Sequence, residues 1–259
     1  MTKREKQLKA FGDLLDIMDE IRVKCPWDRK QTMESLRHLT IEETYELGDA
    51  ILDKDRDEIK KELGDLLLHI VFYAKIASEN GDFDMEDVIR GINDKLVHRH
   101  PHVFGDVEAH TDEQVAQNWE KLKLKEGKSS VLEGVPRSLP ALVKASRIQD
   151  KAASSGFDWE KAEQVMDKVL EEISELQGEV GRSNPQRIEA EFGDVLFSLI
   201  NYARFIEVDP ESALERTNKK FINRFQFMER EVEKEGKKLH DLSLEEMDRH
   251  WIRSKKHFH

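Results

Sequence analysis

The sequence predicts an all-α protein made of tandem, duplicated helical-bundle domains, and three observations support this fold class. Charged residues make up 37% of the 259 residues and aromatic residues 7%, a composition that suits a helical protein better than a sheet protein. Apolar residues recur every three or four positions along long segments, as they do on the buried face of an amphipathic helix. A set of acidic residues also occurs twice at one fixed sequence offset, which indicates an internal duplication.

The first domain is expected to span residues 1–128. Its first helix is predicted over residues 5–22, where apolar side chains follow helical spacing up to the break that contains Pro26. Two longer helices follow, separated by the polar segment DKDRD, and a fourth comes after the turn ENGDFD. A loop then leads to a short final helix. These four later helices are predicted over residues 33–51, 58–78, 85–98 and 113–125.

The second domain is expected to span residues 141–259 and to repeat the first. Residues 129–140 form the predicted linker, because the sequence around them is rich in Gly, Ser and Pro. The segment SSGFDWE interrupts the helical pattern near the place where CPWD interrupts it in the first domain. Helices are predicted over residues 142–153, 161–179, 187–207, 210–234 and 244–256.

The duplicated residues are carboxylates, which lie on the second and third predicted helices of each domain. Each residue of the first set is matched 129 positions later, as the differences 172 − 43 and 194 − 65 show. Pairs three residues apart share a helix face, and apolar runs flank them, so these acids must be paired, neutral or bound to metal. The alternative, that they are solvated helix faces, is disfavoured by their repetition. The two sets are Glu43, Glu46, Glu62 and Asp65, and then Glu172, Glu175, Glu191 and Asp194.

Convergent carboxylates without cysteine ligands favour a hard cation, and we expect Mg²⁺, with Mn²⁺ as a substitute. The competing metal chemistry of helical bundles is a di-iron site, whose usual mark is Glu-x-x-His. Here the motif is Glu-x-x-Asp, and no histidine stands three or four residues after the glutamate, so iron is disfavoured. Glu171 and Glu42, next to the acidic sets, are candidate bases. A simple solvent-facing role is equally open for both.

Each acidic set is followed by cationic residues that could grip the phosphate oxygens a metal leaves uncovered. A role in surface solubility is equally open for these cations. Trp119 and Trp251 stand four residues before the last lysine of each set. They could stack on a base or pack a terminal helix. Together the acids and cations predict a polyphosphate site. The cationic residues are Lys95, Arg99 and Lys123, and then Lys220, Arg224 and Lys255.

The overall charge and the hydropathy pattern exclude other function classes. A formal net charge of −12 argues against a nucleic-acid-binding surface, which needs a basic face. No window approaches the ~18 apolar residues of a membrane span, and the charged N-terminal segment lacks the apolar core of a signal peptide. Cys25 is the single cysteine, which suits a reducing compartment. We therefore predict a cytoplasmic protein with no membrane contact.

Several motifs together resemble the MazG family of nucleoside triphosphate pyrophosphohydrolases. EE-x-x-E is followed by E-x-x-D, with CPWDRKQT upstream and KLVHRHPHVFG downstream, and the similarity continues through NKKFINRF and HWIRSKK. The resemblance implies an all-α fold, Mg²⁺ dependence and a homodimer. It also implies hydrolysis of NTP or dNTP to the nucleoside monophosphate and pyrophosphate, which suits sanitation of the nucleotide pool.

The resemblance further implies that the C-terminal half is the main catalyst. The reaction it implies is metal-assisted hydrolysis at the α-phosphorus. All four acids of the first half are intact, so the sequence leaves the activity of that half open. The alternative function is a helical regulator that binds nucleotide without hydrolysing it. The resemblance assigns metal binding and catalysis to Glu172, Glu175, Glu191 and Asp194, and nucleotide contacts to Lys220, Arg224, Trp251 and Lys255.

Overall fold

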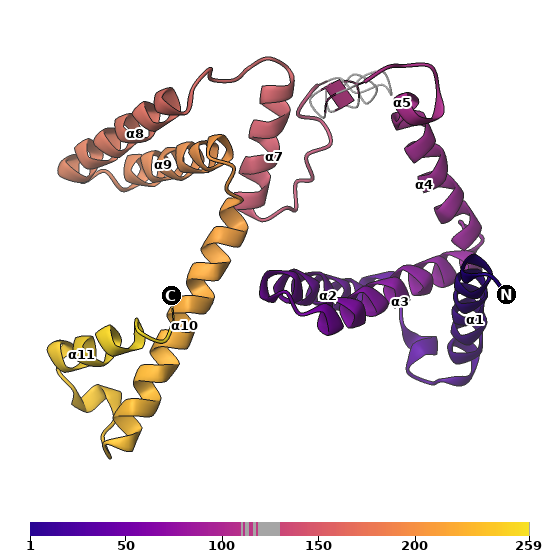
Figure 1. Cartoon of the computed structure of the whole chain (residues 1–259), viewed down its shortest axis with the longest axis horizontal. Coiled ribbons are helices and arrows are strands. Elements are labelled where there is room, and N and C mark those ends of the chain that lie inside the picture. Colours follow the sequence, from indigo (N-terminus) through magenta and orange to yellow (C-terminus); the bar gives the residue numbers. More distant parts are fainter. Residues whose placement is uncertain (110, 112–113, 116–117, 119–129, 259) are drawn as a thin grey trace. The chain divides into compact units, whose positions relative to one another are not determined.

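The all-α prediction is confirmed by the computed structural model, which describes residues 1–109, 111, 114–115, 118 and 130–258 (Figure 1). Every regular element among these described residues is helical. The chain divides into two compact units, Met1–Trp119 and Glu120–His259. The predicted linker at 129–140 and the exact domain limits stay a prediction.

The first unit is organised around two long helices that pack side by side, α2 and α3, with α1 packed on α3 (Figure 1). Asp55 begins α3, because its carboxylate accepts hydrogen bonds of 3.1 Å from the backbone N–H groups of Asp57 and Glu58. Gly81 ends α3 at φ 75°, a left-handed conformation that glycine adopts without strain. The elements are α1 (Lys3–Lys24), η1 (Asp28–Lys30), α2 (Met33–Asp53), α3 (Arg56–Asn80), α4 (Met85–Arg99) and α5 (Pro101–Phe104).

Arg22 fixes the break between α1 and α2. Its guanidinium donates to the backbone oxygens of Asp28 and Gln31, the latter at 3.1 Å. It also pairs with the carboxylate of Glu79 on α3 at 3.0 Å. The segment that interrupts the helical pattern is therefore held against the bundle by charge-assisted hydrogen bonds.

The second unit has a similar central pair, α8 and α9, with α7 packed on α9 and α11 packed on α10. Its cluster of buried apolar side chains lies where α10 meets the following η2 segment and contains Met228, Val232 and Leu242. The elements are α7 (Ala141–Ser154), α8 (Ala162–Arg182), α9 (Pro185–Phe205), α10 (Pro210–Lys234), η2 (Leu239–Asp241) and α11 (Leu244–Ser254).

The duplication extends to backbone conformation. Lys54 after α2 has φ 58° and Ser183 after α8 has φ 55°, and these residues stand 129 positions apart. Both units therefore end the helix that carries the EE-x-x-E motif with a non-glycine residue in the left-handed region. This conformation is strained for a residue with a side chain.

The predicted helices are confirmed where the structure describes them, with ends that differ by a few residues. The loop predicted after residue 98 was wrong in part, because Pro101 starts the one-turn helix α5. Proline suits a first helical position because its missing N–H group would be unpaired there anyway. The helix predicted over 113–125 lies mostly outside the described residues. Among those residues, no helix combines the length and the apolar character that a membrane crossing requires.

Candidate metal centre and nucleotide site

Each unit brings three carboxylates from its two central helices to one point. One oxygen from each residue can be chosen so that the three lie within 4.8 Å of one another. Such a group can hold a single cation, since oxygen ligands of one ion must converge. Three of the four acids predicted in each half are thus brought together. The groups are Glu43, Glu46 and Glu62 between α2 and α3, and Glu172, Glu175 and Glu191 between α8 and α9.

The fourth predicted acid of each half, Asp65 or Asp194, lies outside these groups of three but acts on them electrostatically. Burial raises the pKa of the Glu43 carboxyl above its usual value, and the neighbouring Glu62 and Asp65 charges raise it further. Burial likewise raises the pKa of Glu191, and the charges of Glu175 and Asp194 add to the shift. Both aspartates therefore belong to the same electrostatic environment as the convergent acids.

Glu62 is the buried acid of the first cluster, with 1% of its surface exposed. Its Oε1 lies 3.1 Å from the ammonium of Lys61, whose hydrogen bond holds the pKa of Glu62 below its usual value. Its Oε2 is buried and has no hydrogen-bond partner among the described residues. A buried carboxylate oxygen without a donor is rare and fits a ligand position for a cation.

Glu172 is the corresponding buried acid of the second cluster, with 7% of its surface exposed. The ammonium of Lys168 lies 2.7 Å from Glu172 and 3.0 Å from Glu171. Glu171, a candidate base in the sequence, is thus engaged by a lysine in the structure. The acid–lysine contacts offset part of the repulsion among the carboxylates.

Glu179 was missed in the sequence and lies one turn after Glu175 on α8. It is 6% exposed, and its Oε1 contacts Arg182 at 2.5 Å and Arg187 at 3.6 Å. Its Oε2 is buried without a hydrogen-bond partner among the described residues, and its charge contributes to the raised pKa of Glu191. Its position four residues after Glu175 could have indicated in the sequence that it lies on the same helix face as the cluster.

Both clusters fit a divalent cation. Their donors are all carboxylate oxygens, which Mg²⁺ and Mn²⁺ prefer. Like charges within a few ångströms raise one another's pKa, and a bound cation would reverse that effect by stabilising the ionised forms.

The cationic residues predicted for the second half gather on α10 and α11. The Arg224 guanidinium donates to the backbone oxygen of Phe258 at 2.7 and 3.0 Å and lies 5.9 Å from the Trp251 ring centroid. Trp251 also contacts Phe221, with ring centroids 5.0 Å apart, so it has a packing role. Lys220 lies one turn before Arg224, and Lys255 follows α11 directly.

In the first half, Lys95 and Arg99 lie one turn apart at the end of α4. Trp119 and Lys123 fall outside the described residues. In the second half, Arg224 and Trp251 thus lie beside each other, while the roles of Lys220 and Lys255 stay a prediction. The first-half counterpart of this contact would involve Trp119 and so lies outside the described residues.

Comparison with known proteins identifies the family. Residues 31–104 and 160–227 match the MazG nucleotide pyrophosphohydrolase domain, and these two segments contain the two acidic clusters. The chain is also 47% identical over 250 residues to the nucleoside triphosphate pyrophosphohydrolase/pyrophosphatase MazG of Thermotoga maritima, covering 95% of each chain. The chain belongs to the MazG family.

A second relative extends the MazG match. The nucleoside triphosphate pyrophosphohydrolase of Escherichia coli is 42% identical over 258 residues, which cover 96% of this chain and 98% of the relative. The crystal structure of a MazG-related protein from Thermotoga maritima covers 44% of this chain and 98% of its own, with 28% identity and a TM-score of 0.40. The family match and the two full-length relatives confirm, over nearly the whole chain, the resemblance inferred from the motifs.

Proposed function

We propose that this MazG chain is a Mg²⁺-dependent nucleoside triphosphate pyrophosphohydrolase that acts on NTPs and dNTPs, with nucleotide-pool sanitation as its role. The observation that carries the proposal is the convergence of Glu172, Glu175 and Glu191 between α8 and α9, in a chain that aligns end to end with relatives of that name. Mn²⁺ is the expected substitute ion.

The acidic cluster needs a cation to meet its substrate, because three carboxylates repel a polyphosphate. Glu172, Glu175 and Glu191 would hold the ion, with Asp194 beside them. Bound there, Mg²⁺ would supply an activated water for attack at the α-phosphorus and would offset charge on the leaving pyrophosphate.

Other residues of the second half are assigned by their positions. Lys168 holds Glu172 and Glu171 in place before the ion binds. Arg182 and Arg187 restrain Glu179 in the same way. The nucleotide contacts proposed from the family motif are Lys220, Arg224, Trp251 and Lys255.

The test is pyrophosphate release from NTPs in Mg²⁺, in EDTA and in Ca²⁺. We expect turnover in Mg²⁺ or Mn²⁺, none in EDTA, and binding with little turnover in Ca²⁺, whose looser coordination positions the attacking water poorly. Full activity in the chelator would refute the metal mechanism. Nucleotide binding without pyrophosphate release in any cation would instead support the alternative, a helical regulator.

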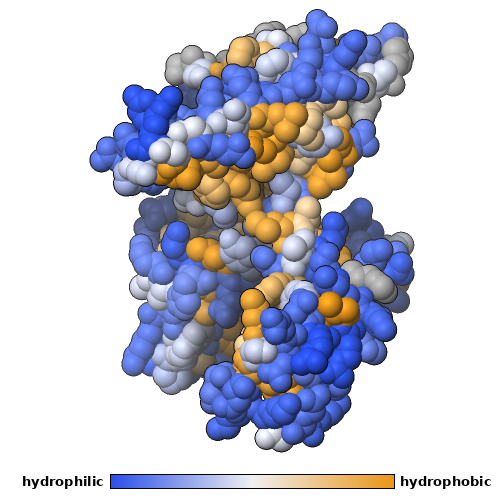
Figure 2. Space-filling view, turned by 90° about the vertical axis from the view of Figure 1, so that its left-hand side faces the viewer, coloured by the Kyte–Doolittle hydropathy of each residue, from blue (hydrophilic) through white to orange (hydrophobic). Residues whose placement is uncertain are grey.

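We also propose a homodimer, because many large apolar side chains of the central helices are exposed in the single chain. Phe192 is 54% exposed and Leu170 is 57% exposed. Figure 2 shows hydrophobic patches in orange among hydrophilic surface in blue. Exposed apolar patches of this kind mark interaction surfaces. Light scattering at micromolar concentration should give a mass above that of one 30.3 kDa chain.

A further inference from the structure

A cavity of about 580 Å³ lies in the second unit beside α9, the helix that carries Glu191. Its walls come from α7, from Leu132 in the segment before α7, from the segment between α7 and α8, and from α9. This volume falls within the range of about 300–1,000 Å³ that is typical of small-molecule sites. The lining is largely apolar and aromatic and includes Phe157, Trp159 and Phe197.

Gln149 supplies an unpartnered acceptor in the wall of this cavity. Its side chain is 6% exposed, and its Nε2 donates to the backbone oxygen of Phe197 at 2.8 Å. Because a carbonyl oxygen only accepts hydrogen bonds, the group that faces Phe197 must be the amide nitrogen of Gln149, and the other group is its oxygen. The Oε1 is buried and has no hydrogen-bond partner among the described residues. A ligand that carries a hydrogen-bond donor could therefore pair with Gln149 Oε1.

Asn201 supplies the complementary group. Its Oδ1 accepts hydrogen bonds from the Nε of Arg204 at 3.2 Å and from the Nη2 at 3.0 Å. Its Nδ2 is then the end that Asn201 can offer to a ligand as a donor. The cavity thus combines an amide acceptor, an amide donor and aromatic faces. Every natural nucleobase has adjacent donor and acceptor groups on its Watson–Crick edge and a π face that stacks on aromatic rings.

An ion pair holds the aromatic segment over the cavity. The Arg204 guanidinium makes two hydrogen bonds to the Asp158 carboxylate, with Nη1 2.9 Å from Oδ2. The neighbouring Phe157 and Trp159 remain 83% and 45% exposed. The ion pair therefore anchors the segment that carries both rings, and their exposed faces are free to stack on a flat ligand.

The cavity and the acidic cluster both involve residues of α9. Asn201 follows Asp194 by seven residues, so the two lie on nearly the same face of α9, about 10 Å apart along its axis. Asp194 borders the cluster, since its charge helps raise the pKa of Glu191. A nucleotide with its phosphates at the cluster can therefore extend along α9 towards the cavity.

We propose that this cavity binds the base of the nucleoside triphosphate, with Gln149 Oε1 accepting a hydrogen bond from it and Trp159 or Phe157 stacking on it. The inference rests on the proposed function, because it concerns the same substrate at the same site. Since all bases can satisfy the amide pair, the cavity provides affinity for a base rather than selection of one.

Two variants of the full chain test this. Gln149→Met keeps side-chain length and removes the acceptor together with the Nε2 bond to Phe197, whereas Asn201→Phe fills the cavity with the residue found 129 positions earlier, Phe72. Gln149→Met should raise the KM for ATP, CTP, GTP and UTP by about tenfold, the usual effect of losing one buried hydrogen bond. Asn201→Phe should raise these KM values at least as much, because it occupies the space of the base, and both variants should leave kcat unchanged. Inhibition by inorganic tripolyphosphate, which has no base, should not change. Gln177→Met makes the same chemical change on an exposed part of α8 and should leave every constant at its wild-type value.

The possible failures are distinguishable. Wild-type KM values in both folded variants, with normal turnover in the unmodified chain, would overturn the base site and leave the proposed function standing. If KM stays constant while sedimentation shows weaker self-association, the cavity belongs to a subunit interface, and the base site is again wrong. A wild-type chain that releases no pyrophosphate from any NTP would overturn the proposed function, and the base site with it.

Discussion

The two units carry the same acids at the same offset, but they bury opposite members of the set. In the first unit the most buried acid of the metal cluster is Glu62 on α3, whereas in the second it is Glu172 on α8. Their counterparts in the other unit, Glu191 and Glu43, are only partly buried, and these two have the raised pKa values.

The lysines that neutralise the buried acids differ too. Lys61 is adjacent in sequence to Glu62, whereas Lys168 stands one helical turn before Glu172. Neither lysine has a lysine counterpart 129 positions away, since those positions are Ala190 and Leu39. The duplicated chain kept the carboxylates but not their counterions. A counterion needs only to reach a buried charge, and several positions on a helix satisfy that condition.

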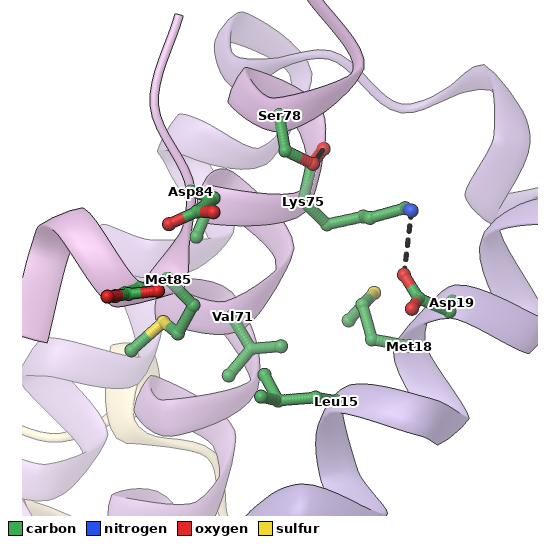
Figure 3. A pocket seen from close by; sticks show the side chains of 10 residues that line it. Leu15, Met18, Asp19, Val71, Lys75, Ser78, Asp84 and Met85 are labelled. Carbon is green, nitrogen blue, oxygen red and sulfur yellow. Dashed lines mark hydrogen bonds and ion pairs between the residues drawn. The ribbon is translucent and has the colours of Figure 1, made fainter. Parts of the chain in front are cut away.

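Packing of the interior separates the units further. Phe72 is 2% exposed in the first unit and packs with Met18 and Leu36. The equivalent residue in the second unit is Asn201, which lines the large cavity. The first unit has a cavity of about 290 Å³ between α1, α3 and α4, where Lys75 and Asp19 pair at 2.6 Å (Figure 3). A second cavity of about 430 Å³ lies between α1 and α4, and Phe72 lines neither of them. At this duplicated position, one copy is thus packed around an aromatic side chain, and the other borders a cavity.

The largest expected effect is on the rate of NTP hydrolysis, and it tests which of the two units is the catalyst. Glu175→Gln keeps the shape of a metal ligand but removes its charge, so NTP hydrolysis should fall on the order of a thousandfold. Glu46→Gln makes the equivalent change in the first unit and should leave most activity in place. Initial rates of pyrophosphate release would measure both effects.

Matching circular dichroism spectra would show that both variants keep their helices. Equal losses from the two substitutions would mean that both sites turn over or are coupled. The assignment of catalysis to the C-terminal half would then be wrong.

The next effect concerns stability. Phe72→Ala should destabilise the protein by about 3–5 kcal/mol, because it leaves a void in a packed core. Asn201→Ala should lower the free energy of unfolding by less than about 1 kcal/mol, because its side chain already borders a cavity. Urea titrations of the two variants compare them directly. Similar destabilisation by both would show that the second unit is packed as tightly as the first.

A smaller effect should be equal in the two units. Lys54→Gly and Ser183→Gly relieve the same left-handed strain at the ends of α2 and α8, and each should stabilise the protein by about 1 kcal/mol. Thermal unfolding of each single variant measures the gain. A gain in one variant and not in the other would show that the two helix ends differ despite their shared backbone conformation.

The smallest effect is a dependence on pH in the metal-free protein. The folded-state pKa of Glu43 and of Glu191 is raised, so their stabilising contribution is present below the unfolded pKa and is lost as pH rises through the folded pKa. Glu43→Gln and Glu191→Gln should therefore raise Tm at pH 7 in EDTA and change it little at pH 4. A larger gain at pH 4 than at pH 7 would contradict the raised pKa values.

The sequence by itself determined the helices and the duplicated acids. Helices such as α3 were predictable because their signals are local: apolar residues at helical spacing, Asp55 as N-cap and Gly81 after the last turn. The acids stood out because Glu43, Glu62 and their counterparts recur at a constant offset. The convergence of Glu46 and Glu175 with them follows from the spacing of three on one helix face.

Only the tertiary structure decided which of these acids are buried and what surrounds them. The exposure of Glu62 and Glu172 depends on how adjacent helices are rotated against each other, and the spacing of residues within one helix does not fix that rotation. The cavity beside Asn201 and the unpartnered oxygen of Gln149 depend on contacts between α7 and α9, about 50 residues apart. Contacts over such separations leave no periodic trace in the sequence, because each is set by the shape of side chains from another element.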